Sequence, residues 1–207
     1  MMSKESALRK RGIAYGEHRE FYGLEAYAIS RRLKQARGLL GRLVIQKPKA
    51  EVLELGCGYW GNNLRLLHQE YPHIKFTGVD LSVSKGVTGI QLVQADIFSW
   101  NPQYEYDAVL SLAVVEHLLN PQAHFRLLAH CTKAHGLVGL TTPTPQSHFI
   151  LKLLAWLKIF DRSEIDDHKN YLTETGIRNL AENTGFSTEE FRTFSAGMNQ
   201  WALLRKK

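Results

Sequence analysis

The stretch EVLELGCGYWGNN, residues 51–63, decides the fold of this chain. A short apolar run reaches Glu54, and Gly56 and Gly58 follow it in a tight turn that opens a helix at Asn62. Glycines let the backbone approach a ligand closely, and a helix N-terminus offers free N–H groups. The stretch therefore predicts a strand, a turn and a helix that hold a ligand at the carboxyl end of the strand.

Downstream, short apolar runs alternate with helix-like segments. We expect strands at residues 51–55, 75–79, 91–95, 107–112, 136–141, 189–194 and 200–204, and helices at 23–44, 62–70, 121–133 and 173–184. Residues 83–90 are rich in glycine, serine and threonine, so they predict a loop. The alternation predicts an α/β fold with a parallel sheet covered by helices on both faces.

Two acidic residues follow predicted strands. Asp80, with Leu81 after it, ends the second strand, where a carboxylate can accept both hydroxyls of a ribose. Asp96 follows the third strand, where a carboxylate can accept a hydrogen bond from the amine of adenine. Taken alone, each could instead be an ordinary loop or capping acid. Together with the glycine turn they indicate a nucleoside site.

The run YDAVLSLAVVEHLLNP, residues 106–121, resembles strand four of the class I methyltransferases that act on small molecules. LELGCG, VDLS, QAD and LTTP match further blocks of that family in the same order, so the resemblance covers roughly residues 50–205. It implies a Rossmann-like, seven-stranded, mostly parallel sheet with an antiparallel last strand. It also implies that S-adenosyl-L-methionine is the cofactor and methyl donor.

The resemblance also implies roles for single residues. Gly56 and Gly58 would face the methionine part and the ribose, and Glu54 would anchor the methionyl amino group. Asp80 would take the ribose hydroxyls. The remaining cofactor-binding residues would be Leu81, Asp96 and Ile97 around the adenine, and Ser111, Leu112 and Ala113 at the methionine end.

The chain departs from the family pattern in its glycine turn. The family has a third glycine two residues after Gly58, whereas Trp60 occupies that place here and Gly61 follows. The turn is therefore expected to be one residue longer. The stretch from Asp80 to Asp96 is also shorter than the family's, which agrees with a loop in place of a helix.

Methyl transfer from an activated donor needs positioning more than a catalytic residue, but a hydroxyl acceptor is helped by a base. His117, after strand four, and His168, beside two aspartates, are the candidates; each could instead be structural. The two cysteines, Cys57 and Cys131, fit no metal motif and are expected to be buried, so no metal is predicted.

The charge divides the chain into two parts. Residues 1–49 form a basic, helical N-terminal extension, and residues 50–207 form the methyltransferase domain. The first 50 residues carry a net charge of +8 and the rest carry −2. A basic segment of this kind suits nucleic acid, anionic lipid or an acidic substrate, but it is also typical of a solvated helix.

An insert at residues 142–172 contains a strongly apolar stretch at 147–160. It is expected to be a core or lid helix, or else a helix that makes peripheral contact with a membrane or holds an apolar acceptor.

The sequence thus predicts a cytoplasmic methyltransferase that acts on a small-molecule acceptor, and the apolar stretch at 147–160 favours an apolar one. The oligomeric state is left open. The alternatives are a nucleic-acid methyltransferase and an inactive cofactor-binding module. Base methylation is disfavoured because strand four lacks the Asn/Asp-Pro-Pro-aromatic turn of enzymes that methylate base amines. Nucleic acid is therefore an unlikely partner.

Overall fold

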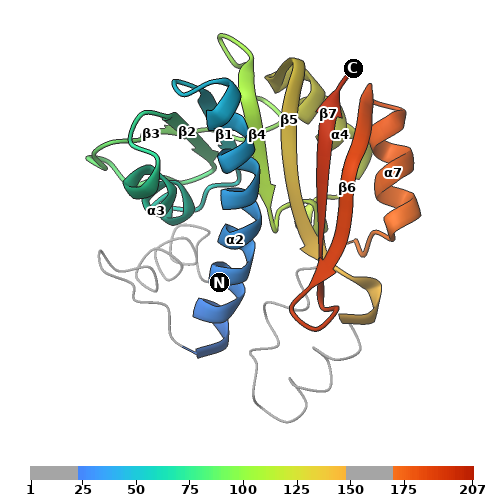
Figure 1. Ribbon diagram of the computed structural model, residues 1–207. Coiled ribbons are helices and arrows are strands. Elements are labelled where there is room, and N and C mark those ends of the chain that lie inside the picture. The colour runs from blue at the N-terminus through green and yellow to red at the C-terminus, as the bar shows by residue number, and fades with distance from the viewer. Residues whose placement is uncertain (1–22, 148–169) are drawn as a thin grey trace, which may run out of the picture.

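A single sheet of seven strands organises the computed structural model, which describes residues 23–147 and 170–207 (Figure 1). The strand order is β3-β2-β1-β4-β5-β7-β6. The strands are β1 (Glu51–Leu55), β2 (Lys75–Asp80), β3 (Gln91–Gln94), β4 (Tyr106–Leu112), β5 (Thr132–Pro143), β6 (Phe186–Phe194) and β7 (Asn199–Lys206). The first five pair in parallel, and β7 pairs antiparallel with both β5 and β6. The predicted sheet with its antiparallel last strand is confirmed.

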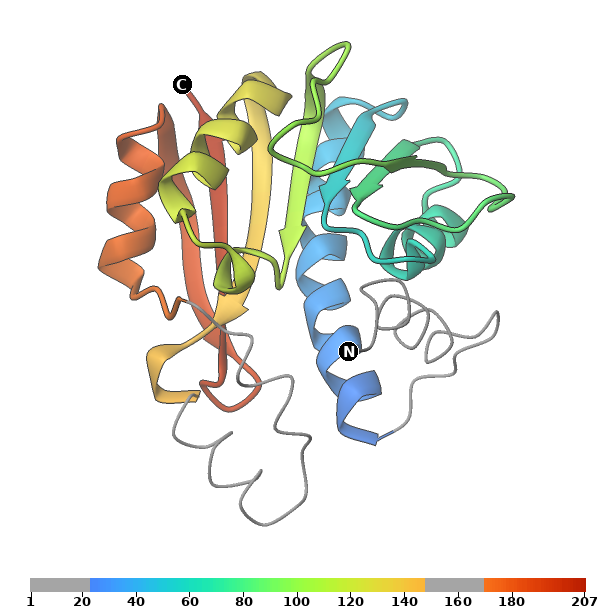
Figure 2. The same cartoon turned by 180° about the vertical axis from the view of Figure 1, so that it is seen from behind.

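Helices cover both faces of this sheet, as predicted. They are α2 (Gly23–Gln46), α3 (Asn62–Glu70), α4 (Pro121–Cys131) and α7 (Glu174–Glu182), with a 3-10 turn, η1 (Val115–His117), after β4. Helix α2 crosses one face (Figure 1), and α4 and α7 lie on the other, which Figure 2 shows from behind. No helix forms at residues 81–90, so the connection from β2 to β3 is irregular.

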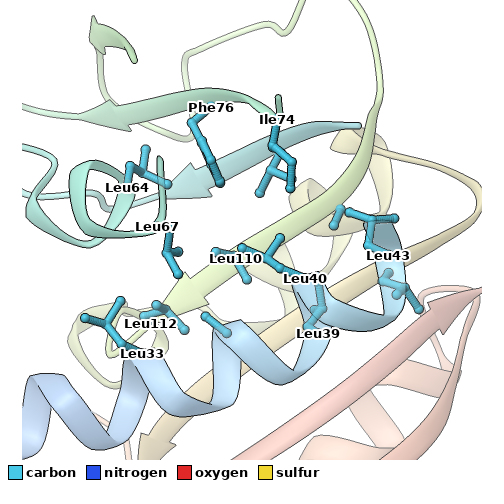
Figure 3. Close-up of a cluster of buried hydrophobic side chains, with 14 of the residues drawn as sticks. Leu33, Leu39, Leu40, Leu43, Leu64, Leu67, Ile74, Phe76, Leu110 and Leu112 are labelled. Atoms are coloured by element: carbon cyan, nitrogen blue, oxygen red, sulfur yellow. The ribbon is translucent and has the colours of Figure 1, made fainter. Parts of the chain in front are cut away.

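Helix α2 contributes its apolar side to one of the two cores. Leu33, Leu39, Leu40 and Leu43 are buried there against α3, β2 and β4 (Figure 3). Two of its arginines form ion pairs, Arg37 with Glu70 at 2.6 Å and Arg42 with Glu190 at 3.0 Å, and Lys47, just after the helix, pairs with Asp107 at 2.6 Å. The boundary at residue 49 stays a prediction, although α2 and the strands share one core.

The ends of α4 and β5 differ from the expectation. The helix predicted at residues 121–133 stops at Cys131, and β5 begins at Thr132 rather than at residue 136. Asn120 caps the start of α4 by accepting a hydrogen bond from the Ala123 N–H at 3.0 Å. The early start of β5 follows from tertiary pairing, because Thr132 is buried opposite Tyr106 of β4.

The apolar stretch at residues 147–160 lies almost wholly outside the described residues, which stop at 147 and resume at 170. Its assignment as a lid, a core helix or a membrane-contact helix stays a prediction. Among the helices that are described, none is long and apolar enough to cross a membrane. Cys57 and Cys131 are buried, as expected, and both are free thiols.

Candidate active site

The glycine turn after β1 is held against two neighbouring strands. Gly56 has a positive φ of 73°, and its N–H donates to the Val79 carbonyl at 2.8 Å. A Cβ at Gly56 would lie 2.6 Å from Val114 Cγ2, so a side chain does not fit between the turn and the end of β4. Gly58 also has a φ of 73°, with open space around its Cα. It is therefore required for its backbone conformation rather than for packing.

In the lengthened turn, the third glycine stands at Gly61, one residue later than in the family pattern. Gly61, with a φ of 56°, is the residue that precedes α3 as its N-cap. A Cβ at Gly61 would lie 2.8 Å from Leu92, which explains why a glycine stands here and not at Trp60. Trp60 instead meets Tyr59 edge to face, with 4.8 Å between ring centroids. Two half-buried aromatic rings thus lie between the glycine turn and α3.

Glu54 is a fully buried acid at the end of β1. Its Oε1 accepts a hydrogen bond from Asn63 Nδ2 at 2.8 Å, while its Oε2 has no partner among the described residues. Burial raises the pKa of Glu54 to about 8, the Asn63 hydrogen bond opposes this, and the nearby Asp80 adds to it. An unpartnered buried oxygen of this kind suits a ligand that brings a hydrogen-bond donor or a positive charge.

Asp80 ends β2 beside the glycine turn. Its Oδ2 accepts a hydrogen bond from the Gly58 N–H at 2.9 Å, and its Oδ1 is 3.5 Å from the Ser82 nitrogen. The acid therefore orders the turn and also lies at the carboxyl edge of the sheet. Leu81 beside it is 68% exposed, which is unusual for a large apolar residue at a strand end.

Asp96 lies at the next strand end, linked to Asp80 by the Ala95 N–H, which donates to the Asp80 carbonyl at 2.9 Å. The exposed Asp96 accepts from the Phe98 N–H at 2.9 Å, which closes a local turn. Ile97 is buried, whereas Phe98 is 47% exposed. Phe98 was not among the site residues predicted from the sequence, although its place next to Ile97 put it at the same edge of the sheet.

Ser111 and Leu112 turn their side chains into the two cores. Ser111 is fully buried, and its Oγ lies 2.9 Å from Nε2 of His124 on α4. Leu112 packs in the cluster around α2. Burial lowers the pKa of His124 to about 4, so this histidine is neutral at physiological pH. Only the backbone at this strand end is therefore left to line a cofactor.

Ala113, the third residue predicted at the methionine end, adopts a φ of 59°. Its N–H donates to the carbonyl and to the hydroxyl of Thr141, at 3.0 and 3.1 Å. A positive φ at a non-glycine residue is uncommon, and tertiary contacts hold it here. The chain leaves β4 in this conformation and enters η1.

Of the two histidines predicted as bases, the structure describes only His117. His117 is half-buried in η1, next to the buried Glu116. His168 lies outside the described residues. Among the side chains of residues 27–147 and 170–207, no group of three or more His, Cys, Asp or Glu is arranged to hold a metal.

A cavity of about 400 Å³ lies beside β3 and does not coincide with these residues. It is lined by Val83–Val87, Leu92 and Gln94. The structure therefore brings Glu54, Gly56, Gly58 and Asp80 together at the ends of β1 and β2, with Asp96 at the end of β3. This arrangement at the carboxyl ends of parallel strands defines a Rossmann-like α/β protein.

Comparison with known proteins gives the family. Residues 19–190 match the model of the family described as a methyltransferase domain. Trans-aconitate 2-methyltransferase from Escherichia coli is 29% identical over 142 residues, which cover 64% of this chain and 56% of that enzyme. The corresponding enzyme from Shigella flexneri is 28% identical over 134 residues, 60% of this chain and 52% of that enzyme. The chain thus spans little more than half the length of these relatives.

Solved structures share the fold at lower identity. A plantazolicin methyltransferase in complex with a monoazolic desmethylPZN analogue and S-adenosylhomocysteine aligns with a TM-score of 0.73 and 17% identity, over 98% of this chain and 92% of that one. The magnesium protoporphyrin IX methyltransferase from Synechocystis PCC 6803 aligns with a TM-score of 0.67 and 16% identity, over 99% and 95%. This chain belongs to the class I S-adenosylmethionine-dependent methyltransferases.

Proposed function

We propose that this protein transfers a methyl group from S-adenosylmethionine to a small-molecule acceptor. The observation that carries the proposal is the unpartnered, buried Oε2 of Glu54 beside the Asp80-anchored glycine turn. A ligand that combines an ammonium group with a ribose fits both acids. The relatives support methyl transfer as the activity. They do not identify the acceptor, because the chain spans only part of their length.

The cofactor contacts follow from the chemistry of each residue. Glu54 binds the methionyl ammonium, and Asp80 accepts from the ribose hydroxyls. Gly56 and Gly58 let the backbone approach the cofactor, and Asp96 accepts from the adenine amine. Leu81, Ile97 and Phe98 pack against the adenine base. Leu81 and Phe98 are exposed apolar side chains, and the flat face of the base would cover them.

When bound, S-adenosylmethionine supplies a methyl group on a positively charged sulfur. The protein's own contribution is to hold the acceptor in line and, for a hydroxyl acceptor, to take its proton. His117 is our candidate for that base because it follows β4 at the same edge as the glycine turn. His168 is the second candidate on sequence grounds.

We favour a small acceptor over nucleic acid, and the ion pairs of α2 support this preference. Arg37 and Arg42 of α2, and Lys47 just after it, bind acids of the same chain, which reduces the positive charge that this region offers to phosphates. Leu119, two residues after His117, is 84% exposed and suits an apolar acceptor or a membrane surface. We place the enzyme in the cytoplasm, where its two free cysteines would stay reduced.

Two measurements test the proposed function. Calorimetry with S-adenosylhomocysteine should show binding, and S-adenosylmethionine with a radiolabelled methyl group should label acceptors in a panel of small hydroxyl, amine and carboxyl compounds, with RNA as the comparison. Binding without any labelling would indicate an inactive cofactor-binding module. Labelling of RNA alone would indicate a nucleic-acid methyltransferase. No binding at all would refute the assignment of the cofactor site.

A further inference from the structure

Glu116 is a second buried acid at the carboxyl edge of the sheet, beyond the cofactor residues. Its side chain is 1% exposed. Its backbone carbonyl accepts a hydrogen bond from the Asn170 N–H at 3.1 Å, and the side-chain amide of Asn170 donates to the Leu118 carbonyl. The backbone of the η1 turn and the segment that begins at residue 170 are thus joined next to Glu116.

The position of Glu116 relative to the glycine turn follows from one close contact. Gly56 abuts Val114, which lies two residues before Glu116 in the chain. Glu54 lies in β1, whereas Glu116 lies in η1 after β4, with Thr142 of β5 beside it. Because the proposed cofactor residues gather at the ends of β1, β2 and β3, we assign the ends of β4 and β5 to the acceptor.

The carboxyl group of Glu116 is only partly compensated by its neighbours. Burial raises its pKa, while His117, Arg32 and Thr142 act in the opposite sense. The charge of Glu116 in turn contributes to a raised pKa of Tyr171. Oε2 of Glu116 is buried and has no hydrogen-bond partner among the described residues. Buried polar atoms in native proteins almost always have a hydrogen-bond partner, so Oε2 of Glu116 is a candidate to receive one from a ligand.

We infer that the Glu116 carboxyl group binds a hydrogen-bond donor on the methyl acceptor, so that the enzyme selects acceptors with a hydroxyl or amine group over acceptors with only a carboxylate. The inference rests on the proposed function. Glu54 and Glu116 then have parallel roles, because each has a buried Oε2 without a partner among the described residues. One unpartnered oxygen receives the cofactor's ammonium group, and the other receives the acceptor's O–H or N–H.

The surrounding charges favour a donor over an anion. Arg32 and His117 lie close enough to lower the pKa of Glu116 by electrostatic attraction. The positive charge next to the site is thus already balanced in part by Glu116 itself. A carboxylate ligand would bring a second negative charge and no proton for Oε2. A hydroxyl or amine satisfies that oxygen directly by donating a hydrogen bond to it.

The test compares three probes that share an aromatic ring: phenol, benzylamine and benzoate. Each is titrated into protein saturated with S-adenosylhomocysteine and labelled with ¹³C at the glutamate carboxyl groups. Phenol and benzylamine should shift the Glu116 resonance, which is assigned by its loss in Glu116→Gln. Benzoate should bind about tenfold more weakly or not at all. Equal or tighter binding of benzoate, or no shift with any probe, would overturn the inference.

The variants supply the second readout. Glu116→Gln should weaken phenol binding about tenfold and leave the affinity for S-adenosylhomocysteine unchanged. Glu182→Gln, at an exposed acid of α7, removes the same charge and should change neither affinity. Unchanged phenol binding in Glu116→Gln would also overturn the inference. A wild-type protein that fails to bind S-adenosylhomocysteine would instead contradict the proposed function, so the two failures are distinguishable.

Discussion

Asp80 has two roles at the residue scale, because the same carboxylate orders the glycine turn and faces the proposed ribose. Its bond to the Gly58 N–H is 2.9 Å long and lies within the protein, so part of its value exists before any cofactor binds. The remaining acceptor capacity is available to a ligand, since a carboxylate has about four lone-pair sites. Replacement of Asp80 therefore affects both the turn and the ligand.

Asp80→Ala should lower the affinity for S-adenosylhomocysteine at least about tenfold, because each lost hydrogen bond to a charged group is worth roughly 1.5–3 kcal/mol. Calorimetry on the folded variant checks this. Glu70→Ala, which removes an exposed acid paired with Arg37, is the control and should bind normally. Wild-type affinity in Asp80→Ala would remove this residue from the site.

Glu54 gives the protein a characteristic dependence on pH. Its pKa rises from an ordinary value near 4.5 to about 8 in the folded state. Between these values the folded chain holds a proton that the unfolded chain has released, so stability falls as the pH rises. Above about 8 both states are ionised and the full penalty is present.

Glu54→Gln should therefore stabilise the unliganded protein more at about pH 8 than at about pH 5, because glutamine has no charge to bury. Thermal unfolding at the two pH values measures the difference. The same variant should bind S-adenosylhomocysteine more weakly, since a neutral amide replaces the partner of the ammonium group. A variant equally stabilised at both pH values would show that Glu54 does not titrate in this window.

At the scale of elements, α2 is held by its leucines and by the ion pairs of Arg37 and Arg42. Leu40 is fully buried in the cluster shared with α3 and β4 (Figure 3). Ile45, five residues later, is 84% exposed. Exposed ion pairs contribute little, with a typical value of about 0–1 kcal/mol. The attachment of α2 thus depends on its apolar side more than on its charges.

Leu40→Ala should lower the free energy of unfolding by about 2–5 kcal/mol, because it removes buried methyl groups and leaves a cavity. Ile45→Ala deletes an aliphatic side chain of the same size on the solvent side and should change it by less than about 0.5 kcal/mol. Denaturant unfolding of both variants gives the comparison. Equal effects would mean that α2 does not share the core.

For the whole molecule, binding of the correct cofactor must raise the stability of the folded state by mass action. S-adenosylhomocysteine at about 100 times its dissociation constant should add about 2.7 kcal/mol. NADH should add nothing, although a glycine turn followed by an acid also suits dinucleotides. A thermal shift assay with both compounds checks this. Stabilisation by NADH alone would contradict the cofactor assignment.

The sequence by itself determined the fold class and most positions of the candidate site. The period of the apolar runs gives the strands and helices, and the glycines and acids of residues 51–63, 76–82 and 93–98 follow strands whose carboxyl ends meet at one edge. These signals are local, since a strand, a turn and a strand-end acid each occupy a few neighbouring residues. The end of α4 was misplaced because the pairing of Thr132 with Tyr106 of β4, which starts β5 early, is a tertiary contact that the local sequence does not show.

Only the tertiary structure decided where side chains point and what they meet. Ser111 and Leu112 are adjacent in sequence, yet one faces His124 and the other faces α2, because alternate residues of a strand lie on opposite faces of the sheet. Likewise, Glu54 and Glu116 read as ordinary acids in the sequence. Their unusual pKa values and unpartnered oxygens arise from burial by segments far apart in the chain, which no local pattern encodes.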